Sequence, residues 1–141
     1  MGTAMTVMIS MLKGYDEELE VYNGALGKTI AKMWLDDSAN NNNGSLYIFF
    51  TDGTGVEIFD DGQDCCENRY ITCDDDLFRV EGATLVDIEI RDGPDIEGEW
   101  GDVHETRFLY INTSYGTITA ETHNEHNGYY GGFVIRVKEI K

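Results

Sequence analysis

This chain has few prolines, lysines and arginines and no long apolar run, and each shortage argues against a class of fold or function. The single proline among 141 residues, with 16 glycines and 41% hydrophobic residues, is typical of one compact globular domain. No apolar run approaches the ~18 residues that a membrane-spanning helix needs, and residues 3–12 are too short for a secretory signal and lack its basic start. We therefore expect a soluble, cytoplasmic protein with no membrane partner.

Cysteine is also rare, because the chain has only three, an odd number, and two of them are adjacent. This pattern argues against the disulfide framework of an extracellular protein. A domain of this length buries roughly two thirds of the surface that its unfolded chain exposes, enough for a core without disulfides or a structural metal. The sequence therefore predicts no cofactor, and it leaves the cysteines available for another role or for none.

Positive charge is in short supply as well. Ten lysines and arginines stand against 27 acidic residues, and the net charge is −17. Residues 57–105 hold 17 of the acids against three arginines, a net charge of −14, whereas residues 106–141 carry +1. Direct binding to nucleic acid is disfavoured, because phosphate binding needs clustered lysine and arginine. The same negative field favours a basic partner, unless the acidic surface only keeps the protein soluble.

Alternation of apolar and polar residues predicts β-strands along most of the chain. The expected strands cover residues 28–35, 46–51, 56–59, 83–91, 106–113, 117–122 and 130–140, the last three forming a meander, with loops at 95–102 and 123–128. Asp52-Gly53 marks a tight hairpin, and Asp74 is expected to cap a short helix. Since no convincing amphipathic helix separates consecutive strands, parallel crossovers are disfavoured. The predicted fold class is mainly β (β-rich α+β), a single antiparallel curved sheet or small open barrel of about six or seven strands with one or two short helices.

The segment Gln63-Asp64-Cys65-Cys66-Glu67 carries two adjacent cysteines among acids, which core packing alone would not select. Neighbouring side chains of an extended segment point to opposite faces, so a zinc ion held by both sulfurs is disfavoured. Nearby carboxylates raise the pKa of a thiol, which disfavours thiolate chemistry. We favour an interpretation in which one of Cys65 and Cys66 fills the core and acids flank the turn.

Seven carboxylates gather around the cysteine pair and shortly after it. They are Asp60, Asp61, Asp64, Glu67, Asp74, Asp75 and Asp76. We interpret them as a solvated acidic face that binds a partner. A divalent cation site is the alternative, although no segment has the order of acids and glycine that a calcium loop requires. The corresponding enzyme hypothesis is a divalent-metal-dependent hydrolase built on Asp64, Glu67 and the nearby acids.

A second candidate site combines aromatic and basic residues of the last third of the chain. Tyr129 and Tyr130 have rings that can stack on a base, and Arg107 and Arg136 can hold an anion beside them. In this alternative a homo-oligomer forms the pocket and sequesters a small nucleotide-like ligand. An aromatic strand that packs in the core is the competing interpretation.

Known catalytic templates are missing from the sequence. It has no phosphate-binding glycine loop, no serine nucleophile elbow and no catalytic cysteine–histidine spacing. His123 and His126 have the HxxH spacing of a metal pair, but no glutamate base on a helix accompanies them, so a polar loop is favoured. We therefore expect a protein that is not an enzyme.

Several short motifs together resemble a family of small, acidic phage and bacterial proteins of unknown function. The motifs are Leu26-Gly27-Lys28-Thr29-Ile30, Asp52-Gly53, Gln63-Asp64-Cys65-Cys66-Glu67, Asp76-Leu77 ahead of Gly82, and Asn127-Gly128-Tyr129-Tyr130. The resemblance covers residues 26–139, and it implies a β-rich domain at 26–141 preceded by a variable extension, residues 1–25, packed on that domain. Family members tend to carry a histidine ahead of the cysteine pair, where this chain has Asp60 and Asp61. The resemblance also implies a phage or prophage origin and action inside a bacterial cell, but no activity.

These observations predict a non-enzymatic, phage-type accessory or counter-defence protein of the host cytoplasm. Its acidic third, residues 57–105, is expected to engage a basic host protein as a nucleic-acid mimic would, in an encounter that is sensitive to salt. The homo-oligomer that binds a nucleotide-like ligand and the metal-dependent hydrolase are the two alternatives.

Overall fold

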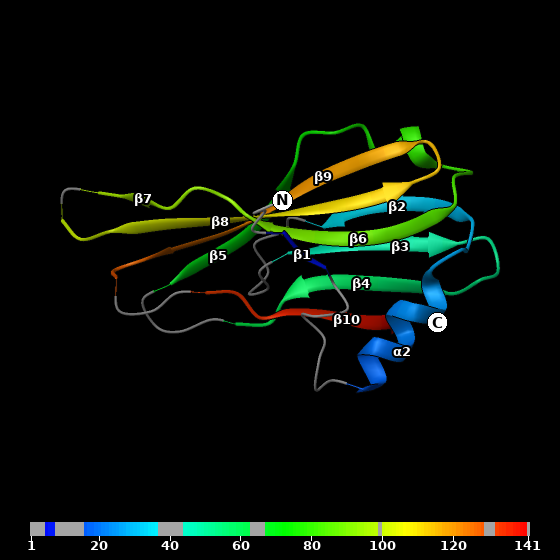
Figure 1. Ribbon diagram of the computed structural model, residues 1–141, viewed down its shortest axis with the longest axis horizontal. Helices are drawn as coiled ribbons and strands as arrows, with labels where there is room; N and C mark the ends of the chain where they lie inside the picture. The colour runs from blue at the N-terminus through cyan, green and yellow to red at the C-terminus, as the bar shows by residue number, and fades with distance from the viewer. Residues whose placement is uncertain are drawn as a thin grey trace.

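The computed structural model describes residues 5–7, 16–36, 44–62, 67–98, 100–128 and 132–140, which form two antiparallel sheets and a helix (Figure 1). The larger sheet has the strand order β1-β6-β8-β9-β5, with β7 beside one end of β8. Its strands are β1 (Met5–Val7), β5 (Asn68–Cys73), β6 (Leu85–Asp92), β7 (Ile96–Glu97), β8 (Val103–Thr113) and β9 (Gly116–His126). The smaller sheet has the order β10-β4-β3-β2. Its strands are β2 (Ile30–Asp36), β3 (Ser45–Phe50), β4 (Gly55–Asp60) and β10 (Ile135–Ile140).

The core lies between the two sheets, and it follows from the alternation of side chains along each strand. On β3, Leu46, Ile48 and Phe50 are buried, whereas Tyr47 and Phe49 between them are only half-buried. The larger sheet contributes its own inward-facing set, which is Leu85, Ile88, Ile90, Leu109, Ile111, Ile118 and Ala120. Apolar residues at every second position therefore account for both inner faces.

The α-helix α2 (Asp16–Ala25) is fixed to both sheets by polar contacts. Tyr22 and Ala25 lie one turn apart on the same side of the helix and are buried. The Tyr22 hydroxyl accepts a hydrogen bond from the backbone N–H of Ile88 in β6 (3.1 Å). Glu18 accepts one from the backbone N–H of Val137 in β10 (2.9 Å). Among the described residues, no helix is both long enough and apolar enough to cross a bilayer.

The two sheets are joined at one end by backbone hydrogen bonds between residues 27–30 and 82–85. The N–H of Ile30 donates to the carbonyl of Ala83 (2.7 Å), and the N–H of Leu85 donates to the carbonyl of Lys28 (3.0 Å). The short 3₁₀ helix η1 (Leu77–Val80) leads into this junction and buries Val80. In the described part of the chain the two sheets stay open and do not close into a barrel.

The predictions of a mainly β, antiparallel fold and of the hairpin at Asp52-Gly53 are confirmed. The single sheet and its strand count are wrong, because ten strands in the described residues form two sheets. The meander is wrong as well, since β8 pairs with β9 whereas β10 pairs with β4. β9 runs through the expected loop to His126, because its alternation continues without a turn residue. Asp76, rather than Asp74, caps the short helix.

The larger sheet projects beyond the smaller one at the left of Figure 1. There β7 pairs with the first residues of β8, in the stretch that was expected to be a loop. β8 continues alongside β9 to the register pair of Val103 with His126, and β9 pairs with β5 as far as Asn68. This projecting end brings together the polar residues of the candidate site.

Candidate functional site

A buried ion-pair cluster surrounds Arg69 on β5. Arg69, Asp60 and Glu67 are 6, 7 and 7% exposed. Nη1 of Arg69 lies 2.9 and 3.0 Å from the two carboxylate oxygens of Asp60, and Nε and Nη2 lie 2.9–3.1 Å from those of Glu67. We call these three residues the Arg69 cluster. Because the planar guanidinium meets two carboxylates with paired hydrogen bonds, the cluster fixes geometry as well as charge.

The Arg69 cluster joins residues that come before and after the cysteine pair in the sequence. Asp60 ends β4, and Glu67 comes just before β5. Gly62 lies against the guanidinium so closely that a Cβ on it would be 2.3 Å from Nη1 of Arg69. Burial raises the pKa of Asp60, while hydrogen bonds from the N–H groups of Val134 and Gly62 and the charge of Arg69 oppose this. The residues that flank the motif therefore hold one buried cation.

Asn124 connects the Arg69 cluster to the segment that follows β9. Its amide nitrogen donates to Glu67 (2.8 Å) and to the backbone carbonyl of Gly132 (3.0 Å). The N–H of Val134 donates to Asp60 (2.9 Å). Asn124 is fully buried, and within the described residues its Oδ1 accepts no hydrogen bond. Residues next to the cysteine motif and next to the Asn-Gly-Tyr-Tyr motif thus meet on one polar network.

A histidine cluster lies on the face of the larger sheet that points away from the core. Nε2 of His104 on β8 is 3.0 Å from Nδ1 of His123 on β9. The other ring nitrogen of His123 lies 2.9 Å from Thr72 Oγ1 and 3.4 Å from a carboxylate oxygen of Glu121. The ring of Tyr70 stacks on His123 with centroids 4.6 Å apart. We call His104, His123, Tyr70, Thr72 and Glu121 the histidine cluster.

Burial perturbs the titration of two members of this cluster. It lowers the pKa of His123, and the neighbouring His104 lowers it further, against the opposing charges of Glu121 and Glu125. Burial, first, and then the hydrogen bond that its hydroxyl donates to Glu125 together raise the pKa of Tyr70 to about 12. Both groups are therefore neutral at pH 7.

The third histidine is separate from the first two. His126 lies on the opposite face of β9, because it is three positions after His123 and successive side chains of a strand alternate between faces. Its Nε2 is 2.7 Å from Glu105, and its Nδ1 accepts a hydrogen bond from the N–H of Gly128 (3.0 Å). Both ring nitrogens of His126 are thus occupied by the protein.

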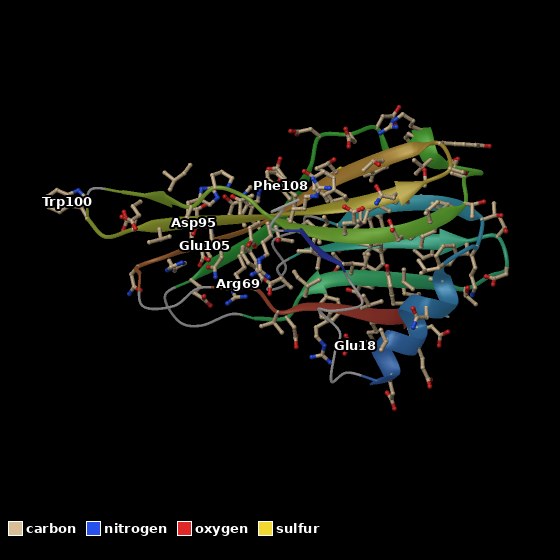
Figure 2. All side chains as sticks on the ribbon, in the orientation of Figure 1. Glu18, Arg69, Asp95, Trp100, Glu105 and Phe108 are labelled. Atoms are coloured by element: carbon tan, nitrogen blue, oxygen red, sulfur yellow. The ribbon has the colours of Figure 1, made fainter. Side chains whose placement is uncertain are left out.

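Residues 92–105 form the feature that we call the acidic arm. This stretch contains six acids and neither lysine nor arginine. Pairing of Ile96 with His104 and a hydrogen bond from the N–H of Gly98 to the carbonyl of Asp102 (2.7 Å) shape it as a hairpin. Trp100 lies at its far tip in Figure 2 and is 87% exposed, and Ile96 is 60% exposed. The arm therefore exposes two large apolar side chains to water.

Of the seven predicted partner-binding carboxylates, the six that the structure describes do not all face solvent. Asp60 and Glu67 are buried around Arg69, so they hold the fold rather than face a partner. Asp61 is exposed and pairs with Arg136 at 3.3 Å. The motif residues Gln63, Asp64, Cys65 and Cys66 lie outside the described residues.

The other three predicted acids lie around η1. Asp75 accepts a hydrogen bond from the N–H of Thr119 (2.7 Å), and Asp76 accepts one from the N–H of Phe78 (3.0 Å) as the cap of η1. Asp74 is exposed. In the described part of the chain, no three histidine, cysteine, aspartate or glutamate side chains are arranged as a metal site.

The two arginines of the predicted nucleotide pocket contact different elements. Arg107 on β8 pairs with Asp92 at 3.0 Å, and its guanidinium lies over the ring of Phe133 (5.3 Å). Arg136 on β10 pairs with Glu18 of α2. Tyr129 and Tyr130, the aromatic residues of the predicted pocket, lie outside the described residues.

Sequence reasoning missed the histidine cluster and Trp100. The pattern of residues 117–126 contained the signal, because its alternation places His123 on the same face as Thr119 and Glu121. That alternation predicts a strand continuing to His126, and a strand beside β8 brings His123 close to His104. For Trp100 the signal was the loop predicted at residues 95–102, because side chains of a connecting segment lie at the surface.

Comparison with known proteins places the chain in a family. Residues 23–135 match the family model described as domain of unknown function (DUF7448). No curated protein and no solved structure matches the chain. The matched range includes the Arg69 cluster, the histidine cluster and the acidic arm, and it overlaps most of the residues on which the resemblance rests. The chain therefore belongs to the DUF7448 family.

Proposed function

We propose that this DUF7448 protein is a non-enzymatic binding protein whose acidic surface engages a basic partner protein, as a nucleic-acid mimic would. The acidic arm is the observation that carries the proposal, because its sequence has six acids and neither lysine nor arginine, and Asp95, Glu97 and Asp102 are exposed on the projecting hairpin (Figure 2). Such a field attracts a positively charged partner over a distance of about one Debye length, ~8 Å at physiological salt, and makes the encounter sensitive to salt.

The acidic arm provides exposed carboxylates, whereas two of the seven carboxylates predicted to bind a partner are buried. Asp95, Glu97 and Asp102 are all exposed, whereas Asp60 and Glu67 are buried and paired with Arg69. A narrow hairpin enters a groove more easily than a broad sheet face does. The basic groove of a nucleic-acid-binding protein offers the complementary charge, since it is lined with lysine and arginine.

Trp100 supports a specific interaction rather than a general attraction. Charge on its own steers many basic proteins equally well, and it contributes more to association rate than to affinity. Tryptophan is enriched among the residues that dominate binding energy when a partner buries them. A partner with an apolar pocket beside its basic groove therefore fits the arm best.

The biological setting belongs to the same proposal. The resemblance to phage and prophage proteins supports an accessory or counter-defence role in the cytoplasm of a bacterial host. A protein that occupies the nucleic-acid groove of a host enzyme keeps that enzyme from its substrate, which is a direct way for an acidic binding protein to act.

Affinity capture from a bacterial lysate, at low and high salt, tests this proposal. The arm variant changes Asp95, Glu97, Glu99 and Asp102 to their amides. The control variant changes Glu17, Glu20, Asp74 and Glu81 to their amides, which alters the net charge equally at exposed sites away from the arm. We expect basic, nucleic-acid-binding proteins to be captured by the wild type and the control variant at low salt, and to be lost with the arm variant.

Competition and a single substitution sharpen the experiment. Added duplex DNA should displace a captured partner, because the arm and the DNA would occupy the same groove. Trp100→Ala should weaken binding by at least ~30-fold, the effect of a hot-spot residue worth ~2 kcal/mol. Capture of the same proteins by the arm variant, or of partners that are not basic, would show that the proposal is wrong.

A further inference from the structure

We propose that His104 and His123 form a binding site for a divalent transition-metal ion, with Cu²⁺ preferred. The two side chains come from neighbouring strands, and their facing nitrogens, Nε2 of His104 and Nδ1 of His123, are 3.0 Å apart. Imidazole is a common ligand of Cu²⁺, Ni²⁺ and Zn²⁺. His104 belongs to the acidic arm, but the proposed metal site does not rest on the partner-binding function of the arm.

The tautomer of His123 leaves a lone pair on the correct nitrogen. Its Nε2 faces Thr72 and the carboxylate of Glu121, and a carboxylate only accepts hydrogen bonds. We assign the proton to Nε2, where it faces Glu121 and the Thr72 hydroxyl can accept it, and this leaves a lone pair on Nδ1 on the side of His104. A carboxylate that holds the far N–H of a histidine is the usual outer partner of a metal-bound imidazole.

His104 contributes the second nitrogen after a change of tautomer. In the hydrogen-bonded state its Nε2–H donates to His123, so binding a metal requires that the proton sit on Nδ1 instead. No net proton is released by this tautomer change when the ring is neutral. His104 is only half-buried and borders an open cavity of about 440 Å³, so its ring can turn and a hydrated ion can reach it.

The spacing of the two nitrogens favours tetragonal ions over zinc. With metal–nitrogen bonds of ~2.0–2.1 Å, a separation of 3.0 Å corresponds to a nitrogen–metal–nitrogen angle of about 94°. Cis ligands of a square-planar or tetragonal ion subtend about 90°, whereas a tetrahedral zinc ion prefers about 109°. Since no third ligand is in place among the described residues, water completes the coordination sphere.

Electrostatics favour a cation at this position. Glu121 is beside His123, and Glu125 pairs in register with His104 while it accepts a hydrogen bond from Tyr70. The negative charge of these two carboxylates therefore acts in the direction of metal binding.

Titration of the full-length protein with Cu²⁺, Ni²⁺ and Zn²⁺ tests the site, after alkylation of the three cysteines removes thiol ligands. We expect one equivalent of Cu²⁺ to bind more tightly than Ni²⁺ or Zn²⁺. His104→Gln should weaken binding by at least ~10-fold, and Glu121→Gln, an outer-partner change, by ~10-fold or more. The matched control is His126→Gln, which should leave affinity unchanged because both nitrogens of His126 are already occupied.

Electron paramagnetic resonance of the Cu²⁺ complex gives a second readout. Nitrogen hyperfine structure should indicate two imidazoles in the wild type and one in His104→Gln, in protein whose circular dichroism is unchanged. Because His104 is half-buried, this variant tests the site without disturbing the more buried His123. Absence of stoichiometric binding, or an equal loss of affinity in His126→Gln, would overturn the proposal.

Discussion

The guanidinium of Arg69 lies against the backbone of Gly62, with no room between them for a side chain. A Cβ on Gly62 would be 2.3 Å from Nη1 of Arg69 and 2.6 Å from its Cζ. The N–H of Gly62 also donates to Asp60 (3.1 Å), the carboxylate that Arg69 binds. Glycine at this position is therefore required by the close approach of the Arg69 cluster.

Gly62→Ala should destabilise the protein, because the added methyl group displaces a guanidinium that is held by two carboxylates. We expect a loss of ~1–3 kcal/mol in the free energy of unfolding, measured by urea denaturation. Gly24→Ala is the matched control, since a Cβ there meets nothing within 4 Å and Gly24 is part of α2. That substitution should stabilise the protein by ~0.5–1 kcal/mol. Equal stabilities for the two variants would contradict this account of Gly62.

Arg69→Met should be more damaging than any loss of an exposed arginine. It leaves Asp60 and Glu67 buried without a cation, which costs ~3–5 kcal/mol in the free energy of unfolding. Arg91→Met is the control, because Arg91 pairs with Glu89 at the surface and such pairs contribute less than ~1 kcal/mol. Thermal unfolding followed by circular dichroism distinguishes the two. If Arg69→Met unfolds at the wild-type temperature, the cluster does not support the fold.

Features of the fold that local burial determines could be predicted from the sequence, whereas those that depend on distant contacts could not. Alternation along residues 46–51 and 56–59 correctly predicted β3 and β4, because local burial dictates it. The partition into two sheets depends on where the chain crosses after His126, and alternation carries no information about which strands pair. The local sequence does not show whether an aspartate is buried, so it could not distinguish the buried Asp60 from the exposed Asp61. Their difference arises from Arg69, nine residues after Asp60.

Tyr22→Phe should destabilise the attachment of α2 to β6. The Tyr22 hydroxyl accepts a hydrogen bond from the N–H of Ile88, and both residues are buried. Without the hydroxyl, this N–H has no partner in an apolar environment, at a cost of ~1–3 kcal/mol. Amide hydrogen exchange at Ile88 should accelerate, and urea denaturation gives the size of the loss. Tyr115→Phe, at a position that is 57% exposed, should change stability by less than ~0.5 kcal/mol. Unchanged exchange at Ile88 in Tyr22→Phe would contradict the predicted role of the hydroxyl.

His123 should make the stability of the protein depend on pH in the mildly acidic range. Its pKa in the folded state is lowered, chiefly by burial and then by His104, below the value of ~6.5 expected in the unfolded chain. As the pH falls through ~6.5, the unfolded chain binds a proton that the folded protein does not yet bind, so stability is present above this pH and is lost below it. Urea denaturation between pH 7.5 and 5.5 should show this loss, and His123→Gln should reduce its slope. Proton NMR of the His123 ring gives the folded-state pKa directly. A value above 6.5 would mean that the carboxylates of Glu121 and Glu125, rather than burial, control this histidine.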